Sequence, residues 1–564
     1  MEVKSKTPII LCGGDINYSH LPIGTNRSNA MIPVNGKPVI GWILDNLEIK
    51  GFREAVVVLQ FDNRKLSNYL GWAYADRMDI HYAYVQPNGA ILHSLLAGLS
   101  WIQPGKGVLI VLGDTLVEDA LPEVNDYVFT GHYDEPENWC LAEINEARNI
   151  QAFYDKQNIE GPNLEALAGV YALSRVDVLR SVIIRQIQQQ HRELCSALDI
   201  YNQQIALKAI PATSWYDFGH ISGFNRAKRN LLQSRYFNSL TIDPVEGVIT
   251  KISRKTEKLE DELNWYDQLP EPLQIFTPKL LKKNTDSDQV RITQEYYGYP
   301  NLAELFVFGD LNVAVWKYTL DQLILVHQRF NAYRYSLSGQ CIREMYWNKT
   351  CERLAELVKE PGWADLFESD WIEVNGVELK NWPLLKEDIA MLVEEMTENV
   401  AGSVIHGDYC FSNILYDVNN QIVRLIDPRG SFGEKGIYGD PRYDMAKLRH
   451  SVHGLYDFIV ADLFRLDEPK PGQFVFEINS PEKQLDLIRH FDQLTEAAGY
   501  SRSEIRLIEA LLFLSMTPYH KGHPRRQKAM FLNGILFLNQ LLQDENRNRP
   551  GWNHLQNQTA GAVV

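Results

Sequence analysis

Short apolar runs alternate with amphipathic segments over about the first 230 residues of the chain. Apolar residues at helical spacing predict helices at 37–50 and 90–102, and runs rich in β-branched residues predict strands at 7–13, 53–60, 80–86 and 107–114. Strands that alternate with helices are typical of a largely parallel α/β sheet. The first part of the chain is therefore predicted to be an α/β domain.

The pattern changes near residues 228–235. Two alternating runs, 238–243 and 248–253, flank the turn Pro244–Gly247 and predict a β-hairpin, and an amphipathic helix follows at 258–269. After about residue 310 we expect mostly helices, apart from two strands around residues 404 and 425. Because 564 residues are too many for one core, we predict domains at 1–230 and 231–550 and a polar, frayed tail at 551–564.

Composition and charge limit the classes of function. Apolar residues make up 45% and charged residues 23% of the chain, as in ordinary globular proteins. The net charge of −16, from 56 basic and 72 acidic side chains, argues against a general nucleic-acid or anionic-membrane binder. No apolar run reaches the length of a transmembrane helix, so we expect no membrane insertion and a cytoplasmic protein.

The cysteines are scattered and contain no CxxC pair. Neither a cysteine metal site nor a disulfide framework is therefore expected, and a reducing cytoplasm fits. The six positions are Cys12, Cys140, Cys195, Cys341, Cys351 and Cys410.

A polar loop between two apolar strands has the most specific spacing in the sequence. His406-Gly407-Asp408 ends the first strand, Asn413 follows five residues after Asp408, and the second strand ends at Asp427. Phosphoryl transfer in a kinase site needs one carboxylate for the proton of the acceptor hydroxyl, and an amide oxygen and a second carboxylate for Mg²⁺. The segment closely resembles the catalytic loop and metal-binding strand of the aminoglycoside phosphotransferase and choline kinase family.

This resemblance implies a bilobal, protein-kinase-like α+β domain over 231–550. In such a domain Asp408 would be the catalytic base, Asn413 and Asp427 would bind Mg²⁺, and His406 would brace the loop. Tyrosines near the motif are expected to belong to the core more than to a cage for a quaternary ammonium group. No Walker A motif occurs, so the P-loop class is not supported.

A kinase site also needs a strand lysine for the ATP phosphates and a helix glutamate that orients this lysine. Lys251 lies in the second strand of the predicted hairpin, and Glu262 lies in the helix that follows, where Glu257 and Glu260 are alternatives. The segment that starts at Glu295 is similar to the hinge that packs against adenine in this family.

The start of the chain combines a strand with a glycine-rich loop. Gly13 and Gly14 follow the first strand, and backbone N–H groups of such loops can bind a triphosphate. Gln86 and Gly89 follow a later strand. Residues 7–228 resemble the sugar-1-phosphate and phosphocholine-type nucleotidyltransferases. The resemblance implies a Rossmann-like domain with a mixed, mostly parallel sheet, helices on both faces, and nucleotide contacts at these four residues.

Three further positions follow the same resemblance. Asp114 lies at the end of a strand, Asp217 lies in the segment Trp-Tyr-Asp-Phe-Gly-His, and Lys156 lies between them. The two carboxylates would together hold Mg²⁺ on the triphosphate, and the lysine would meet the phosphate of the acceptor.

The glycine-rich loop departs from the family. Tyr18 and Asn29 stand at about the positions where the family has an arginine and a lysine. Arg27 is the nearest cation that could replace them and stabilise the departing pyrophosphate. A folded but inactive nucleotidyltransferase domain is the alternative that this departure leaves open.

Together the two resemblances predict a bifunctional enzyme. The kinase would phosphorylate a hydroxyl of a small metabolite with ATP, and the first domain would join the product to a second nucleoside triphosphate, CTP being the first expectation. Such fusions make activated precursors of cell-surface polysaccharides. A kinase with a merely binding or regulatory first domain and a non-catalytic scaffold are the alternatives. The acceptor stays open among choline, ethanolamine, a polyol, a sugar and a hydroxy acid, and the oligomeric state is also open.

Overall fold

The chain divides into two compact units, residues 1–233 and 234–564, where the sequence predicted a boundary between 230 and 231. The structure is a computed structural model, and it describes residues 6–13, 29–86, 89–231, 238–254, 256–285, 289–398 and 401–548. None of the helices within these ranges is long and apolar enough to cross a membrane.

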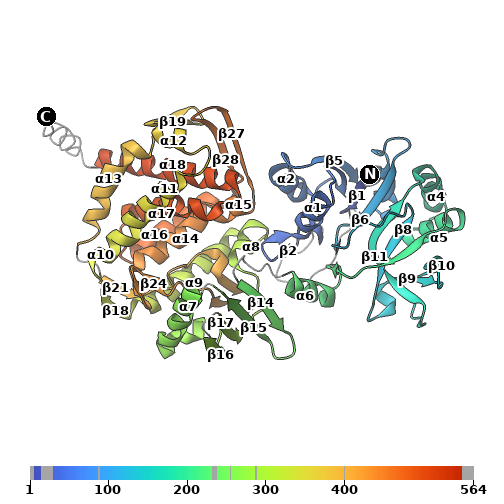
Figure 1. Cartoon of the computed structure of the whole chain (residues 1–564), viewed down its shortest axis with the longest axis horizontal. Coiled ribbons are helices and arrows are strands. Elements are labelled where there is room, and N and C mark those ends of the chain that lie inside the picture. The colour runs from blue at the N-terminus through green and yellow to red at the C-terminus, as the bar shows by residue number, and fades with distance from the viewer. Residues whose placement is uncertain are drawn as a thin grey trace. The chain divides into compact units, whose positions relative to one another are not determined.

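A mixed sheet forms the centre of the first unit (Figure 1). Its strands follow the order β10-β9-β11-β6-β1-β4-β5, with β8 beside β11 and β12 beside β8. Strands β1, β4, β5 and β6 are parallel, whereas β11 is antiparallel to β6. The bounds are β1 Lys6–Leu11, β4 Glu54–Gln60, β5 Asp79–Val85, β6 Gly107–Leu112, β8 Tyr127–Gly131, β9 Cys140–Ile144, β10 Ile150–Asp155, β11 Leu164–Leu173 and β12 Lys208–Pro211.

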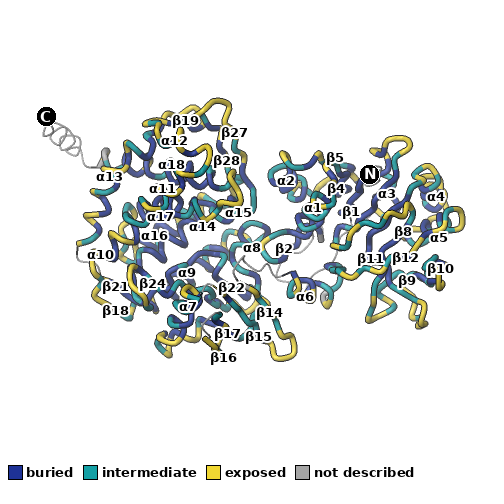
Figure 2. The backbone as a smooth tube through the Cα atoms, in the orientation of Figure 1, coloured by how far each residue is buried: buried dark blue, intermediate teal, exposed yellow. Residues whose placement is uncertain are grey.

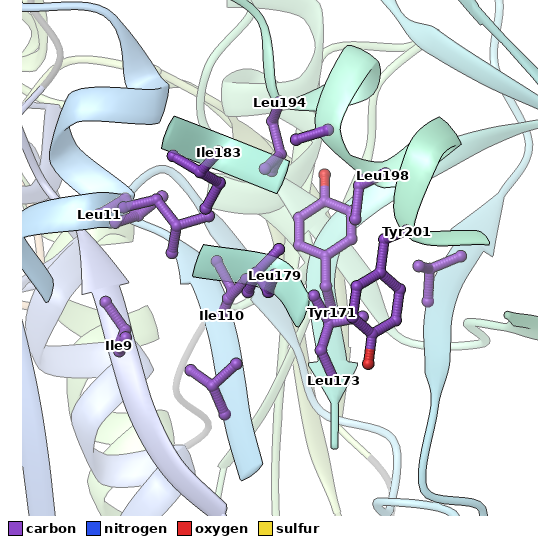
Figure 3. Packing of buried hydrophobic residues seen from close by; sticks show 14 of the residues in the cluster. Ile9, Leu11, Ile110, Tyr171, Leu173, Leu179, Ile183, Leu194, Leu198 and Tyr201 are labelled. Carbon is purple, nitrogen blue, oxygen red and sulfur yellow. The ribbon is translucent and has the colours of Figure 1, made fainter. Parts of the chain in front are cut away.

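Helices cover this sheet because both of its faces are apolar. Ile9 and Ile10 are neighbours on β1 whose side chains point to opposite faces, and both are fully buried. On the face of Ile9, Leu179 and Ile183 of α4 and Leu198 of α5 lie in one hydrophobic cluster with β6 and β11 (Figure 3). Helix α3 lies against β1, β4 and β5 on the same cluster. The helices are α1 Val39–Ile49, α2 Arg64–Ala73, α3 Ile91–Leu99, α4 Val176–Gln188, α5 Leu194–Gln204 and α6 Ile221–Asn230.

The second unit begins with an antiparallel sheet of order β14-β15-β17-β16. The predicted hairpin is confirmed, because β14 pairs with β15, and the Asp243 carboxylate accepts the N–H groups of Val245 and Glu246 in the turn. Helix α7 packs Leu259 and Leu263 against this sheet. The bounds are β14 Asn238–Asp243, β15 Val248–Ser253, α7 Thr256–Gln268, β16 Leu280–Thr285 and β17 Val290–Glu295.

The rest of the second unit is mainly helical, and its central helices are deeply buried (Figure 2). Helix α17 packs on both α14 and α18. Around the polar loop, β21 pairs with β18 and β26, and β22 pairs with β23. The helices are α8 Leu302–Val307, α9 Val313–Asn331, α10 Gly339–Ile342, α11 Lys349–Leu357, α12 Ala364–Glu368, α13 Trp382–Glu395, α14 Pro441–Val452, α15 Tyr456–Val460, α16 Gln484–Ala497, α17 Arg502–Met516 and α18 Pro524–Asn548. The strands are β18 Arg334–Ser336, β21 Ala401–Val404, β22 Ile414–Asp417, β23 Ile422–Leu425 and β26 Tyr438–Gly439.

One sheet in this helical part was not predicted. The expectation of mostly helices after residue 310 missed the order β20-β19-β28-β27, formed by β19 Trp371–Val374, β20 Val377–Lys380, β27 Phe464–Lys470 and β28 Gln473–Ile478. Phe474 and Phe476 are buried while Val475 between them is 49% exposed, which is the period of a half-buried strand. Charged residues in β27 hide this alternation in the sequence.

Candidate functional site

The carboxyl ends of the parallel strands bring several predicted residues to one edge of the first sheet. Gly13 follows β1, Gln86 follows β5 and Asp114 follows β6. Ligands bind at this edge in open α/β sheets, because loops and helix N-termini gather there. The edge is therefore the candidate nucleotide site of the first unit.

Gly13 has no room for a side chain. A methyl group on its Cα would lie 2.9 Å from Cγ2 of Val85 and 3.0 Å from Oγ of Ser94. Its carbonyl oxygen accepts a hydrogen bond from Nε2 of Gln60 at 3.0 Å. The start of the glycine-rich loop is thus fixed against β5 and α3, with backbone as the group nearest to a ligand.

Gly89 closes a tight turn before α3. Its N–H donates to the carbonyl oxygen of Gln86 at 3.2 Å, and a methyl group on its Cα would lie 3.1 Å from the same oxygen. The Gln86 side chain is exposed, so it can reach a nucleotide at this edge.

The carboxylates of Asp114 and Asp217 approach one point. A methyl group built on Gly219 would lie 3.1 Å from Oδ2 of Asp114 and 3.2 Å from Oδ1 of Asp217. Asp217 ends β13 (Trp215–Asp217), which pairs with β7 (Thr115–Val117), the strand that directly follows Asp114. Carboxylate oxygens are the ligands that Mg²⁺ prefers, so this pair fits the predicted metal.

The start of α6 holds the Asp217 side chain in place. Its oxygens accept hydrogen bonds from the backbone N–H of Gly219 at 3.0 Å and of His220 at 3.2 Å, and Oδ2 lies 2.9 Å from Nδ1 of His220. A methyl group on Gly223 would collide with Oδ2 and lie 2.9 Å from the backbone oxygen of Asp217. The position of this carboxylate therefore depends on a glycine in the first turn of α6.

Gly223→Ala is expected to lower nucleotidyl transfer by about tenfold or more, because the new methyl group displaces the Asp217 carboxylate. Alanine favours the helix by about 1 kcal/mol, which opposes the strain from the new methyl group. The melting temperature should therefore change little. Gly71→Ala is the matched control, because a methyl group at this glycine of α2 meets nothing within 4 Å. Pyrophosphate release by both variants measures the effect, and equal rates would show that Asp217 is not part of the site.

Lys156 is the next predicted residue of the site. It follows β10 with φ of 50°, and its backbone N–H donates to the Trp139 oxygen at 2.9 Å. The hydrogen bond with Asp217 raises the pKa of His220, and the charge of Lys156 acts against this. A pocket of about 170 Å³ adjoins Asp217 and is lined in part by Trp139 and Trp215.

The sequence did not predict the aromatic side of this pocket. Trp139 contacts Trp215 with ring centroids 5.0 Å apart and His220 with centroids 4.7 Å apart. The position of His220 three residues after Asp217 was the one signal in the sequence that could have identified the aromatic side of the pocket.

Part of the predicted loop lies outside the described residues, namely Gly14, Tyr18 and Arg27. Asn29 begins the 3₁₀ turn Asn29–Met31. The Lys37 ammonium forms an ion pair with Asp45, as suits a structural residue rather than a ligand of pyrophosphate.

In the second unit, one lysine joins two carboxylates from distant segments. Nζ of Lys251 on β15 lies 2.5 Å from Oε2 of Glu262 on α7 and 3.0 Å from Oδ1 of Asp427 after β23. Burial alone would lower the pKa of this ammonium, but the two carboxylates raise it above its ordinary value. Of the three candidate glutamates, Glu262 is buried and contacts Lys251, whereas Glu257 lies on the surface near Lys435.

Asp408 and Asn413 also contact each other. Nδ2 of Asn413 donates to Oδ2 of Asp408 at 2.8 Å and to its backbone oxygen at 3.0 Å, which leaves the amide oxygen to face a cation. The Asp408 side chain keeps 38% exposure, and its Oδ1 lies 2.8 Å from Nζ of the buried Lys447 on α14. Burial would raise the pKa of Asp408, but Lys447, with His406 and Arg429, holds it well below its ordinary value.

His406 holds the loop by hydrogen bonds, which is the role that we expected from the sequence. Its Nε2 lies 3.1 Å from the Ile426 oxygen, and its Nδ1 accepts the N–H of Asp408 at 3.3 Å. Burial lowers its pKa to about 4, so the ring is neutral and its two nitrogens have one donor and one acceptor role. The N–H groups of His406 and Gly407 both donate to Asp444, at 2.7 and 2.8 Å.

Glu295 ends β17, and its carboxylate is hydrogen-bonded within the protein. Its Oε2 accepts hydrogen bonds from the N–H of Lys279 at 3.1 Å and the hydroxyl of Tyr297 at 2.8 Å. Only the backbone and the neighbouring residues of this segment are therefore left for the predicted contact with adenine.

The fold brings two of the scattered cysteines close to a carboxylate, an arrangement that the sequence did not predict. Cys140 on β9, Asp155 on β10 and Cys195 on α5 place their donor atoms within 4.8 Å of one another. Both cysteines are free thiols. The fold brings them together across 55 residues, so no spacing rule could find them.

Comparison with known proteins finds a match within the first unit. Residues 9–176 match the MobA-like NTP transferase domain, and the unit has the Rossmann-like α/β fold with a mixed, mostly parallel sheet. The bifunctional protein GlmU of Methanococcus maripaludis is 27% identical over 220 residues, which is 38% of this chain and 51% of the relative. GlmU of Methanocaldococcus jannaschii is 23% identical over 229 residues, or 40% and 54% of the two chains. The chain spans about half the length of the curated relatives that it matches.

Similar solved structures also cover the first part of the chain. HddC from Yersinia pseudotuberculosis in complex with GMP-PN has 14% identity and a TM-score of 0.32, covering 40% of this chain and 99% of its own. A UDP-glucose pyrophosphorylase with UDP-glucose has 16% identity and a TM-score of 0.34, covering 41% and 99%.

Proposed function

We propose that the chain is a bifunctional enzyme. The second unit, a bilobal kinase-like domain, phosphorylates a hydroxyl of a small metabolite with ATP. The first unit then transfers a nucleotidyl group, from CTP as first candidate, to the phosphorylated product. The product is an activated precursor of the kind used for cell-surface polysaccharides, and the enzyme works in the cytoplasm.

The contact of Lys251 with both Glu262 and Asp427 carries the kinase proposal. A small-molecule kinase needs a lysine on the ATP phosphates, a glutamate that orients it and a metal carboxylate nearby. These groups come from a strand, a helix and a loop that are up to 176 residues apart, and they meet within 3.0 Å. A lysine without a role in the site would face solvent. It would not pair with two carboxylates in a partly buried position.

The residues of the kinase site have distinct roles in this proposal. The ionised Asp408 accepts the hydrogen bond of the acceptor hydroxyl and takes its proton as the oxygen bonds to the γ-phosphorus and ADP departs. Lys251 binds the ATP phosphates, and Glu262 orients it. Asn413 and Asp427 would hold Mg²⁺, which when bound neutralises charge on the triphosphate.

The first unit supplies the second reaction. The phosphate of the kinase product attacks the α-phosphorus of the second nucleoside triphosphate, and pyrophosphate leaves. Gly13, Gly14, Gln86 and Gly89 bind the nucleotide, and Lys156 orients the phosphate of the acceptor. Asp114 and Asp217 would hold Mg²⁺, which when bound neutralises charge on the triphosphate, and Arg27 would stabilise the leaving pyrophosphate.

A second candidate is a kinase whose first unit only binds nucleotide. The substitution of Tyr18 and Asn29 for the usual arginine and lysine favours it. Pyrophosphate release with ATP, CTP, GTP, UTP and dTTP, each with a panel of phosphorylated acceptors, separates the two. Release with at least one pair supports transfer, and ADP formation without any release supports the binding role.

A further inference from the structure

Four cationic side chains of the second unit lie near the loop that carries Asp408. Tyr443, one turn before Lys447 on α14, accepts a hydrogen bond from Arg429 at 3.2 Å and stacks on Tyr346, which lies one turn before Lys349. Lys349 and Arg353 lie one helical turn apart on α11, Arg429 follows the Asp427 loop, and Lys447 comes from α14. We call Lys349, Arg353, Arg429 and Lys447 the cation cluster.

The fold holds three members of the cluster in place. Lys447 pairs with Asp408 at 2.8 Å. The stem of Arg429 packs on the backbone beside Asp408, because a methyl group on Gly407 would lie 2.7 Å from the Arg429 Cβ. Arg353 donates to the Ser515 oxygen at 2.9 Å and to the Tyr519 hydroxyl at 2.6 Å.

Three of the four cations lack a carboxylate partner. Among the described residues, no acidic side chain lies within ion-pair distance of Lys349, Arg353 or Arg429. Arg429 donates to the Tyr443 hydroxyl at 3.2 Å, and its Nε is buried without a hydrogen-bond partner. The contact of Lys349 is the sulfur of Met345 at 3.9 Å.

This arrangement is costly without a ligand. Burial, followed by the charges of Arg429, Arg353 and Lys447, lowers the pKa of Lys349 to about 5, and Asp408 opposes this only in part. Like charges gathered in a partly buried place repel one another unless an anion neutralises them. Glu356 bears on Arg353 from one turn further along α11, but it is not within ion-pair distance.

We propose that the cation cluster binds an anionic group of the acceptor, so that the kinase substrate is a small hydroxyl compound with a carboxylate or phosphate. This inference rests on the proposed kinase function, because it places the acceptor next to Asp408. It disfavours choline and ethanolamine, whose positive charge the cluster would repel. Hydroxy acids, sugar acids and sugar or polyol phosphates fit.

The two cluster members on α11, Lys349 and Arg353, are separate from the residues assigned to ATP. Lys251 and Glu262 belong to the strand β15 and helix α7, whereas α11 packs on α17 and on the turn Thr517–His520. Loss of Lys349 should therefore change the affinity for the acceptor and leave the KM for ATP nearly unchanged.

The test compares acceptors that differ in charge. Full-length protein with a non-hydrolysable ATP analogue and Mg²⁺ is titrated calorimetrically with glycerate, glycerol 3-phosphate, glycerol, glucuronate, glucose and choline, and ADP formation is followed with ATP. We expect an anionic member to bind and react at least tenfold better than its neutral counterpart. The carboxylate and phosphate arms show which anion the site prefers.

Lys349→Met should weaken binding of that anion at least tenfold and raise the melting temperature of the ligand-free protein, since a half-buried amine without a counter-ion is removed. A merely structural lysine would give a lower melting temperature. Lys386→Met, an exposed lysine of α13, is the matched control and should change neither. Lys349→Gln repeats the test if the first variant folds poorly.

Two results would overturn the anion site: neutral or choline acceptors that bind as well as the anions, or unchanged anion affinity in Lys349→Met. Anion binding that depends on Lys349, without ADP formation from any acceptor, would retain the site and contradict the proposed kinase function instead.

Discussion

Asp408→Asn is expected to reduce ADP formation by about 10²–10⁴-fold, because the amide cannot take the proton of the acceptor hydroxyl. The amide oxygen can still accept a hydrogen bond from Lys447, so the second unit should stay folded at assay temperature. Steady-state ADP release with ATP and the best acceptor measures the effect. The KM for ATP should stay within about threefold, because Lys251 and Asp427 are unchanged.

Asp267→Asn is the matched control for this variant. Its carboxylate lies on the exposed surface of α7, where it pairs with Lys283 at 2.6 Å, and the substitution should leave the rate unchanged. Turnover of Asp408→Asn near that of the control would remove Asp408 from the catalytic role. A circular dichroism melt of both proteins excludes unfolding as the cause of a lost rate.

Asp114→Ala is expected to lower nucleotidyl transfer by about 10³-fold or more, since a lost metal carboxylate costs several kcal/mol of transition-state stabilisation. The rate of pyrophosphate release with a phosphorylated acceptor measures this loss. ADP formation by the same protein should be unchanged, which serves as an internal control.

Asp62→Ala, an exposed aspartate before α2, provides the external control. If Asp114→Ala releases pyrophosphate as fast as Asp62→Ala, then the converging carboxylates do not form the metal site. Raised Mg²⁺ should restore little activity, because the alanine offers no ligand atom.

Patterns within short stretches of the sequence predicted those parts of the fold that depend on contacts between neighbouring segments. The alternation of apolar strands and helices gave the first sheet, and the turn Pro244–Gly247 between two alternating runs gave the hairpin of β14 and β15. The spacing between Lys251 and Glu262 likewise anticipated a contact that one strand and the next helix can make. In each case neighbouring segments pack on one another, so the sequence order already contains the geometry.

Contacts between distant segments were beyond this reasoning. Lys447 is 39 residues after Asp408, and on the sequence it is an ordinary residue of an amphipathic helix. Lys349 and Arg353 likewise match a solvent-exposed helix face until the fold brings α11 near the loop. The approach of Cys140 to Cys195 has the same origin. β9 and α5 are distant in the sequence, and the fold of the first sheet brings them together.

The joint action of the two units on one small molecule is the central claim, and isotope tracing tests it most directly. The full-length protein is incubated with ATP labelled with ¹⁸O in its γ-phosphate, CTP, Mg²⁺ and the acceptor that gives the most ADP. The masses of the products are measured by mass spectrometry. The account predicts a nucleoside-diphosphate-linked acceptor that contains the labelled phosphate next to the acceptor oxygen, with pyrophosphate released from the second nucleotide. Asp114→Ala should stop at the labelled phosphorylated acceptor, and Asp408→Asn should form no labelled product. A labelled phosphorylated acceptor that the wild-type protein never converts, with CTP or any other nucleoside triphosphate, would contradict the account.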